Sequence, residues 1–351
     1  MHLPDPIPIQ DAELSAALSA AIDGKTKPRG SLGQLERLAH RLGMIQRTLT
    51  PRIDAPAIVV FAADHGVVAE GVSAYPQDVT WQMVENFLRG GAAINVLARQ
   101  HGVELLIVDA GVNHRFGERP GLVDRKIGPG TRNFAHEPAM TLEECMLAMQ
   151  YGAGVVEDLT GGVVGFGEMG IGNTTSASAL MHKLSGLGIE DCVGAGTGLD
   201  DAGISRKARV IRDAARKHPG AMPVMEVLAT FGGYEIAMMA GAMLRAAERR
   251  MAVLVDGFIA TAALLAAARM RPSVLDYCIF SHCSDEHGHR RLLRFLGGRP
   301  LLHLGMRLGE GTGCAMAVPI LRSAVAILNE MATFDSARIS EMDAAQNGII
   351  A

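Results

Sequence analysis

The chain has 351 residues, of which 48% are hydrophobic and 20% are charged. This apolar content is enough for a large core and excludes disorder over most of the chain, while the length corresponds to about two domains. The formal net charge of −4 argues against a general nucleic-acid binder, in which a basic excess is expected.

The cysteines and the apolar runs indicate the cellular compartment. The five cysteines are scattered without a CxxC pair, which argues against a disulfide framework and favours a reducing environment. The start of the sequence lacks the basic-then-apolar order of a secretory signal. The longest apolar stretch, 258–268, is interrupted by Thr261 and is too short to cross a bilayer. We therefore expect a cytoplasmic protein with no membrane segment and no nucleic-acid partner.

Helical periodicity marks both ends of the chain. Residues 10–48 carry leucines at helical spacing, and residues 319–333 and 336–347 follow a helical pattern again. No strand-like run interrupts these stretches. We expect residues 1–51 and 321–351 to pack together as a small helical domain.

The middle of the chain alternates short apolar runs with helical stretches. Runs of this kind are typical of strands buried on both faces of a parallel sheet. Strands that alternate with helices predict a mostly parallel, doubly wound, Rossmann-like α/β sheet of about six strands. We place this sheet in one large α/β catalytic domain over residues 52–320. The expected strands are 57–62, 103–109, 162–166, 252–256, 276–280 and 300–304.

A glycine-rich loop, GEMGIGNTTSASAL over 167–180, follows the third expected strand and leads into a helix. Ligands of parallel sheets bind beyond the carboxyl ends of the strands. Glycines leave backbone N–H groups free to face a ligand, and a helix N-terminus adds partial positive charge, so the loop resembles a cradle for phosphate or carboxylate. No lysine follows its last glycine, which excludes a Walker A loop. An ordinary capped helix after a tight turn is the alternative.

A second glycine-rich loop, 194–203, contains Asp200 and Asp201. Its glycines precede the acids, and no strand runs directly into them, which excludes the acidic loop of phosphoribosyltransferases that use a diphosphate sugar. The two acids can instead cap the helix that begins near Ile204. Lys207 could reach back from that helix toward an anion.

Segment 281–289, SHCSDEHGH, concentrates potential metal ligands. It has neither a CxxC nor an HExxH spacing, and histidines on a polar loop after a strand more often form hydrogen bonds. We expect no metal site here.

Glu310 stands alone among glycines in the sequence LGEGTG. Apolar residues precede it, and a carboxyl group in partly apolar surroundings has a raised pKa, which suits a general base. A solvent-facing turn glutamate is the alternative interpretation.

Taken together, ordered segments along nearly the whole chain resemble one family, the nicotinate-nucleotide–dimethylbenzimidazole phosphoribosyltransferases of cobalamin lower-ligand synthesis. The segments are KPRGSLGQLERLA, FAADHGVVAEGVSAYPQDVTWQMVENFLRGGAAINVLAR, DAGV, GTRNF, GEMGIGNTTSASAL, GAGTGLDDAGISRKARVI, GGYEIAMMAGAM, VLVDGFI, SHCSDEHGH and LGEGTGCAMA.

The resemblance implies a reaction and a set of site residues. Phosphoribose would pass from nicotinate mononucleotide to 5,6-dimethylbenzimidazole with inversion at C1′, giving α-ribazole 5′-phosphate and nicotinate. Glu310 would be the catalytic general base. The residues implied for the aromatic-base pocket are Ser73, Tyr75 and Gln82. Those implied for the nucleotide are Glu168, Gly170, Asn173, Thr174 and Lys207.

The implied chemistry needs no cofactor. A pyridinium nitrogen leaves as a neutral group, so we expect neither a general acid nor a metal ion. The resemblance also implies a homodimer, for which the apolar stretch 236–246 offers a surface, unless that stretch is internal core.

Other functions can be weighed against this one. A transfer to another acceptor, such as adenine or a phenolic compound, and a non-catalytic nucleotide-binding homologue remain alternatives. A dehydrogenase that uses NAD would need G-x-G-x-x-G directly after the first strand, and residues 61–66 do not supply it.

Overall fold

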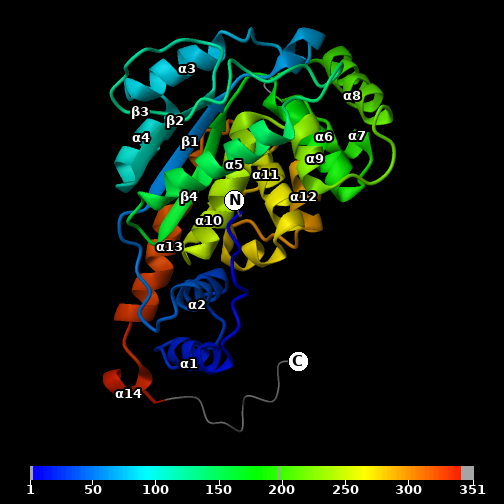
Figure 1. The fold of residues 1–351 in the computed structure, drawn as a ribbon. Helices are drawn as coiled ribbons and strands as arrows, with labels where there is room; N and C mark the ends of the chain where they lie inside the picture. Colours follow the sequence, from blue (N-terminus) through cyan, green and yellow to red (C-terminus); the bar gives the residue numbers. More distant parts are fainter. Residues whose placement is uncertain (1–2, 197, 341–351) are drawn as a thin grey trace. The chain divides into compact units, whose positions relative to one another are not determined.

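The computed structural model describes residues 3–196 and 198–340 (Figure 1). These residues group into two compact units. The larger unit contains the residues up to Pro8 together with Asp54–Val318, and the smaller contains Ile9–Ile53 and the described residues from Pro319 onward.

The larger unit is built around a six-stranded parallel sheet in the order β3-β2-β1-β4-β5-β6. Every residue of β1 is buried, as a strand covered on both faces requires. This is the strand order of dinucleotide-binding Rossmann sheets, in which the order reverses beside the first strand, here between β1 and β4. The predicted fold class is confirmed. The strands are β1 (Ala57–Ala63), β2 (Glu104–Gly111), β3 (Leu122–Asp124), β4 (Val163–Met169), β5 (Ala252–Val255) and β6 (Cys278–Phe280).

One expected strand is wrong, and one observed strand was not expected. Residues 300–304 form only a bridge between Leu302 and His282, since Pro300 has no N–H to donate to a ladder. The sixth strand is instead β3, a short, partly exposed edge strand that pairs with β2. The three residues of β3 are too few and too exposed to form an apolar run, so the sequence pattern did not predict this strand.

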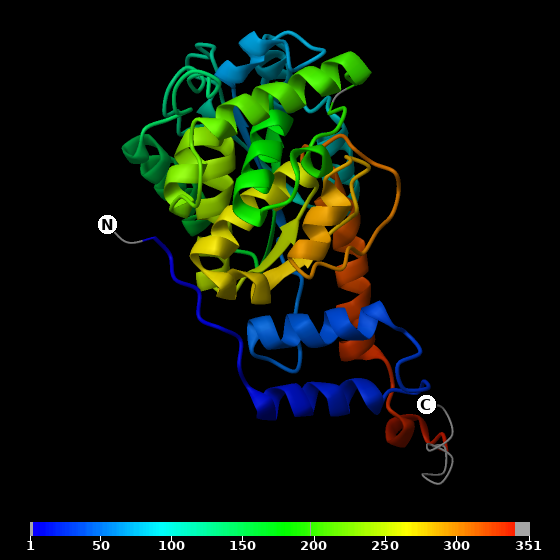
Figure 2. The same cartoon turned by 90° about the vertical axis from the view of Figure 1, so that its right-hand side faces the viewer.

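Helices cover both faces of the sheet (Figures 1 and 2). Helices α3 and α4 pack on one face, while α10 and α11 pack on the other, with α5 and α6 outside them. Figure 2 shows the green to orange helices of this second face in front of the strands. The helices are η1 (Gly66–Glu70), α3 (Val79–Leu88), α4 (Ala93–His101), α5 (Leu142–Glu157), α6 (Asn173–Ser185), α7 (Ile189–Cys192), α8 (Asp201–Arg216), α9 (Val224–Phe231), α10 (Tyr234–Glu248), α11 (Phe258–Met270), η2 (Pro272–Tyr277) and α12 (His289–Phe295).

The apolar stretch 236–246 is internal core. All of its residues except Arg245 are buried within α10. Gly152 of α5 and Gly241 of α10 let the two helix backbones touch, because a β-carbon on either would lie less than 3.0 Å from a carbonyl of the other helix. This stretch is therefore not a free surface for a dimer.

The smaller unit contains α1 (Ala12–Asp23), α2 (Gln34–Gln46) and α14 (Phe334–Ala337). Leu18 of α1 and Leu42 of α2 are fully buried, and an ion pair of 2.9 Å joins the buried Lys27 to the half-buried Glu36. Of the helical stretch expected at 336–347, residues 341–347 lie outside the described residues.

Helix α13 (Thr312–Glu330) runs from the larger unit into the smaller. Among the described residues it is the one helix long and apolar enough to cross a membrane. However, 56% of its apolar window is buried inside the structure, as in the core helix of a soluble protein. The sequence pattern predicts a helix over 319–333, but it did not indicate one of membrane-spanning length, because Arg322 divides the apolar residues.

Candidate active site

Three acidic residues lie at the carboxyl ends of neighbouring strands, on both sides of the point where the strand order reverses. Asp64 follows β1, Glu168 lies near the end of β4, and Asp256 follows β5, and all three are buried. A pocket of about 600 Å³, part of it open to solvent, lies at this edge of the sheet. Its lining residues are Glu168, Met169, Gly170, Ile171, Asn173, Thr174, Gly196, Gly257, Phe258, Ile259, Ser284, Glu286, Arg307, Leu308 and Gly309.

Glu310 lies in the loop that leads into α13 and is 5% exposed, so it is not a solvent-facing turn residue. Its φ of 62° is in the left-handed region, which costs a non-glycine residue about 1–2 kcal/mol. Burial raises the pKa of its carboxyl group, an N–H bond from Ile94 opposes the rise, and the charge of Asp256 adds to it. A raised pKa makes the ionised carboxylate a stronger base.

Glu310 lies next to the pocket lining and points toward helix α4. Gly309 lines the pocket, whereas Glu310 itself does not. Its Oε2 accepts a hydrogen bond from the backbone N–H of Ile94, in the first turn of α4, at 3.5 Å. The carboxyl group therefore reaches from beside the pocket to the first turn of α4.

Two features fix the loop that carries Glu310. A β-carbon at Gly167 of β4 would lie less than 3.0 Å from the Glu310 carbonyl group, so the loop rests on the strand backbone. Asp256 accepts hydrogen bonds from the N–H groups of Gly311 at 3.2 Å and Gly313 at 2.7 Å.

Glu168 is held at the rim of the glycine loop. Its Oε2 accepts a hydrogen bond from the Asn173 side chain, and its Oε1 packs where a β-carbon of Gly309 would be. Burial, and then the charges of Asp256 and Glu235, raise the pKa of Glu168 to about 8, against the Asn173 bond. This carboxyl group can therefore bind or release a proton near neutral pH.

The glycine loop ends at Gly172, and α6 begins at Asn173. Gly172 has a φ of 95° and no side chain that could cap the helix, and the N–H groups of Asn173 and Thr175 donate to the carbonyls of Gly170 and Gly172. Asn173 and Thr174, in the first turn of α6, line the pocket. Lys207 of α8 is fully buried beneath them, and its Nζ donates to Thr174 Oγ1 at 2.7 Å. Burial lowers the pKa of Lys207 to about 8. A helix N-terminus with a buried ammonium group nearby suits an anion such as phosphate.

The second glycine loop has a different role from the first. Asp200 caps α8, accepting the N–H of Gly203 at 2.8 Å, as the capping interpretation predicts. Gly196 is held from both sides, because its N–H donates to Glu286 at 3.2 Å and its carbonyl accepts from Arg307 at 3.0 Å. Glu286 and Arg307 thereby shape one wall of the pocket.

The structure does not bring Ser73, Tyr75 and Gln82 to the lining of this pocket. The Ser73 hydroxyl accepts the N–H of Tyr75 at 3.2 Å, Tyr75 is 50% exposed, and Gln82 lies exposed on α3. Their segment nevertheless touches the glycine loop, because Thr80 accepts the N–H of Ile171 at 3.1 Å. A role in binding the aromatic base stays a prediction for these three residues.

The histidine-rich segment forms hydrogen bonds. His289 Nδ1 accepts the N–H of Ser284 at 2.8 Å, so its Nε2 carries the proton and donates to Thr261 Oγ1 at 2.9 Å. Within the described part of the chain, no three His, Cys, Asp or Glu residues are grouped to hold a metal ion.

Several supporting residues were not foreseen. Asp256 is not among the predicted site residues, although an acid directly after a buried strand is a recognisable signal. Glu235 forms a hydrogen bond with His65 at 2.6 Å across 170 positions of sequence, and nothing local marks that pairing. Glu286 and Arg307 likewise act through the backbone of a distant loop.

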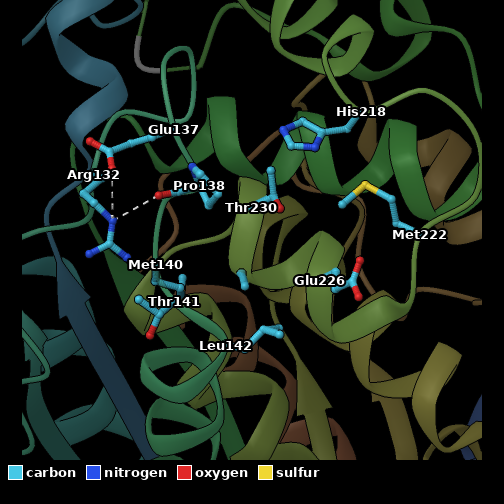
Figure 3. Close-up of a pocket in the computed structure, with 11 residues that line it drawn as sticks. Arg132, Glu137, Pro138, Met140, Thr141, Leu142, His218, Met222, Glu226 and Thr230 are labelled. Atoms are coloured by element: carbon cyan, nitrogen blue, oxygen red, sulfur yellow. Dashed lines mark hydrogen bonds and ion pairs between the residues drawn. The ribbon is translucent and has the colours of Figure 1, made fainter.

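A second pocket, of about 730 Å³, lies between the loop before α5 and helix α9 (Figure 3). Figure 3 shows that the Arg132 guanidinium on its wall is already bound to Glu137 and to the Pro138 carbonyl. Glu144 also pairs with Arg132. The charge of Arg132 is thus satisfied within the protein, which favours the pocket at the sheet edge as the active site.

Comparisons with known proteins point to one family. A family model described as phosphoribosyltransferase matches residues 7–339. The nicotinate-nucleotide–dimethylbenzimidazole phosphoribosyltransferase of Janthinobacterium sp. (strain Marseille) is 60% identical over 334 residues, which cover 94% of this chain and 97% of the relative. The enzyme of the same name from Cupriavidus taiwanensis is 59% identical over 343 residues, covering 97% and 99%. A crystal structure of the enzyme of this name from Thermus thermophilus is similar with a TM-score of 0.91 at 44% identity, covering 95% of this chain and 100% of that one.

Proposed function

This chain belongs to the nicotinate-nucleotide–dimethylbenzimidazole phosphoribosyltransferase family, and we propose that it catalyses the reaction for which the family is named. Phosphoribose passes from nicotinate mononucleotide to 5,6-dimethylbenzimidazole, giving nicotinate and α-ribazole 5′-phosphate. The observation that carries the catalytic assignment is Glu310, a buried carboxylate with a raised pKa beside a pocket that suits a phosphate ester.

The bond changes balance without a further reactant. One acceptor nitrogen attacks C1′ with its lone pair while the bond from C1′ to the pyridinium nitrogen breaks, and that electron pair stays on nicotinate. Attack from the opposite face turns a β-nucleotide into an α-product. The second acceptor nitrogen becomes acidic as positive charge develops, and Glu310 accepts its proton. A general base of this kind contributes about 10²- to 10⁴-fold in rate.

Positive charge at the N-terminus of α6 and on Lys207 indicates where the phosphate of the nucleotide binds. The phosphate binds at the N-terminus of α6, where Asn173 and Thr174 line the pocket and Lys207 supplies positive charge through Thr174. Glu168 and Gly170 border the same space and face the ribose. Glu168 accepts hydrogen bonds when ionised and can donate one when protonated, which suits ribose hydroxyl groups.

The acceptor half lies on the other side of Gly309. Glu310 points toward α4, and α3 beside it carries Gln82. The apolar residues Leu308 and Phe258 border the nucleotide pocket. A methylated bicyclic base held between Glu310 and the segment of Ser73, Tyr75 and Gln82 would meet C1′ at this border. Alignment of the two substrates supplies the remaining acceleration.

A chromatographic assay tests the reaction. The purified, EDTA-treated protein is incubated with nicotinate mononucleotide and dimethylbenzimidazole, and nicotinate and α-ribazole phosphate are quantified. Equal amounts of both products are expected, with no loss of activity on metal removal. The absence of both products would overturn the proposed reaction, and product formation from adenine or phenolic acceptors alone would identify the acceptor as wrong.

The Glu310→Gln variant tests the catalytic role. Glutamine keeps the size of the side chain and cannot accept the proton, so kcat should fall by about 10²- to 10⁴-fold. Binding of nicotinate mononucleotide, measured by calorimetry, should stay within about threefold of the wild type, or roughly 0.6 kcal/mol. Turnover close to that of the wild type would refute the general-base role.

We further propose that the protein is a homodimer, as the resemblance to the family implies, and that it is cytoplasmic, as its scattered cysteines indicate. We also propose that its catalytic domain comprises residues 52–320, as the alternation of strands and helices in the sequence predicts. Light scattering coupled to size exclusion tests the oligomeric state, and a monomer mass would contradict it. Limited proteolysis tests the domain limits.

A further inference from the structure

Asp256 holds the helix turn that follows Glu310. It comes directly after β5 and is 2% exposed. Its Oδ1 accepts the N–H groups of Gly313 at 2.7 Å and Cys314 at 3.2 Å, and its Oδ2 accepts the N–H of Gly311 at 3.2 Å. One carboxylate therefore binds three N–H groups at the start of α13, the helix whose first turn fixes the position of Glu310.

The backbone at Glu310 needs such an anchor. Gly309, Glu310 and Gly311 have φ values of 86°, 62° and 83°, so three successive residues are left-handed. Glycine adopts this region without strain, and glutamate does not. A strained residue persists only where its surroundings determine its conformation. The surroundings here are the backbone of Gly167 on one side and the carboxylate of Asp256 on the other.

We infer that Asp256 is the positioning residue of the reaction: its carboxylate holds the left-handed turn that aims Glu310 at the acceptor base. Asp256 itself does not touch the substrates in this role, and it acts through Glu310. The inference rests on the proposed function of Glu310 as general base.

The charges around Asp256 give this role a measurable signature. The groups that face it are His282 after β6, with Nε2 3.8 Å from Oδ1, Cys314 on α13, Glu168 on β4 and Glu310 in the loop. Burial raises the pKa of Asp256 to about 7, against the N–H bonds that it accepts. The charge of Asp256 also contributes to the raised pKa of Glu310. Removal of that charge therefore lowers the pKa of Glu310.

The test compares Asp256→Asn with Glu310→Gln and with a control, Asp109→Asn. Asparagine keeps one acceptor oxygen and loses the charge, so part of the anchor is lost. Asp109 is also buried at the carboxyl end of a strand and accepts a backbone N–H, from Val112 at 2.9 Å, but Asp109 lies on β2. For each protein, kcat is measured against pH, and the Kd of nicotinate mononucleotide is measured by calorimetry.

For Asp256→Asn we expect kcat to fall about 10- to 100-fold, as a misaligned catalytic group predicts. Nucleotide affinity should change less than about threefold. The decrease of kcat at acid pH, the acid limb of the pH profile, should move to lower pH. Asp109→Asn should keep the kcat and the acid limb of the wild type. Full kcat in Asp256→Asn, while Glu310→Gln is inactive, would overturn the positioning role alone. Full kcat in Glu310→Gln would overturn the general-base role of Glu310, on which the inference rests.

An equal loss of kcat and of nucleotide affinity in Asp256→Asn, with an unmoved acid limb, would show a merely structural residue and would also overturn the inference. If Asp256→Asn does not fold, Gly313→Ala replaces it. A β-carbon at Gly313 would lie less than 3.0 Å from both the His282 ring and Asp256 Oδ1, so it pushes the turn away from an intact carboxylate. The inference then requires the same loss of kcat, and wild-type turnover in Gly313→Ala would refute it.

Discussion

Gly167 and Glu310 are in direct backbone contact, although they lie far apart in the sequence. A β-carbon on Gly167 would lie less than 3.0 Å from the carbonyl carbon of Glu310 and from the nitrogen of Gly311. The missing side chain of a central strand residue therefore sets how closely the catalytic loop approaches the sheet. Because both neighbours are backbone atoms, no side-chain rotation can make room for a substituent.

Gly167→Ala should therefore displace the loop and impair catalysis. A shift of about 1 Å in a catalytic group can cost about 10²-fold in rate, and we expect a loss of kcat of roughly that size. Steady-state kinetics with dimethylbenzimidazole measures it, and the Kd of nicotinate mononucleotide shows whether the nucleotide site is spared.

Gly154→Ala is the matched control for this substitution. Gly154 lies inside α5, and a β-carbon there would meet nothing within 4 Å. Alanine in a helix interior is favoured over glycine by about 1 kcal/mol, so this variant should keep its kcat and gain stability. If Gly167→Ala also kept the kcat of the wild type, the distance between the Glu310 loop and β4 would not determine the rate, which would contradict this argument.

The pH dependence of turnover should report on Glu310. Burial raises the pKa of its carboxyl group, and only the ionised form can accept a proton. Turnover should therefore fall as the pH falls through that raised pKa, above the range of an ordinary glutamate. The residual activity of Glu310→Gln should lack this acid limb. An identical limb in both proteins would assign the titration to another group.

Lys207→Met should weaken nucleotide binding more than it slows the chemical step. Methionine fills the buried space but removes the charge and the bond to Thr174. An interaction between a charged group and its partner is worth about 1.5–3 kcal/mol, so removal of the positive charge near the bound phosphate should raise Kd by roughly 10- to 150-fold. Calorimetry with nicotinate mononucleotide measures this loss.

Lys183→Met provides the comparison on α6. Lys183 lies in the last turn of that helix and donates to the backbone carbonyls of His218 and Gly220. Its charge is remote from the N-terminus of α6, so nucleotide affinity should be unchanged. Equal losses in the two variants would indicate that Lys207 acts only on stability.

The sequence was sufficient for features that local patterns encode. The central strands are apolar on both faces, and they stand out as continuous runs, such as 57–62 within β1. Glu310 stands out because it is the one acid in the glycine-rich segment LGEGTG. The edge strand β3 and the false strand at 300–304 mark the limit of this method, because pairing at a sheet edge depends on partners rather than on pattern.

Local sequence patterns do not predict the contacts that the fold creates between distant residues. Sequence inspection cannot show that Asp256 binds the turn after Glu310, or that Glu235 reaches His65, because each pair meets only when separate strand–helix units assemble. The left-handed backbone at Glu310 is equally invisible, since glutamate has no preference for it. The supporting acids therefore emerge only from the folded chain.

Glu168→Gln should change how the stability of the unliganded protein depends on pH. The pKa of Glu168 is about 8 in the folded chain and about 4.3 when unfolded, so the folded state holds the proton more tightly between these values. The stability that this group contributes is complete below about pH 4.3 and is lost as the pH rises through about 8. Each pH unit in that window removes up to about 1.4 kcal/mol, and glutamine, which does not ionise, removes this dependence.

Thermal unfolding at pH 6 and pH 9 measures the difference. The Tm of the wild type should fall further between these two pH values than the Tm of Glu168→Gln. Glu85→Gln is the opposing control, because Arg119 holds the pKa of Glu85 below its ordinary value. The stability that Glu85 contributes is present at high pH and is lost only in acid. The Tm of Glu85→Gln should therefore fall between pH 6 and pH 9 by as much as the Tm of the wild type. If Glu168→Gln and the wild type lose the same amount, Glu168 is ionised throughout this range, and its proposed ability to donate a hydrogen bond to the ribose would be wrong.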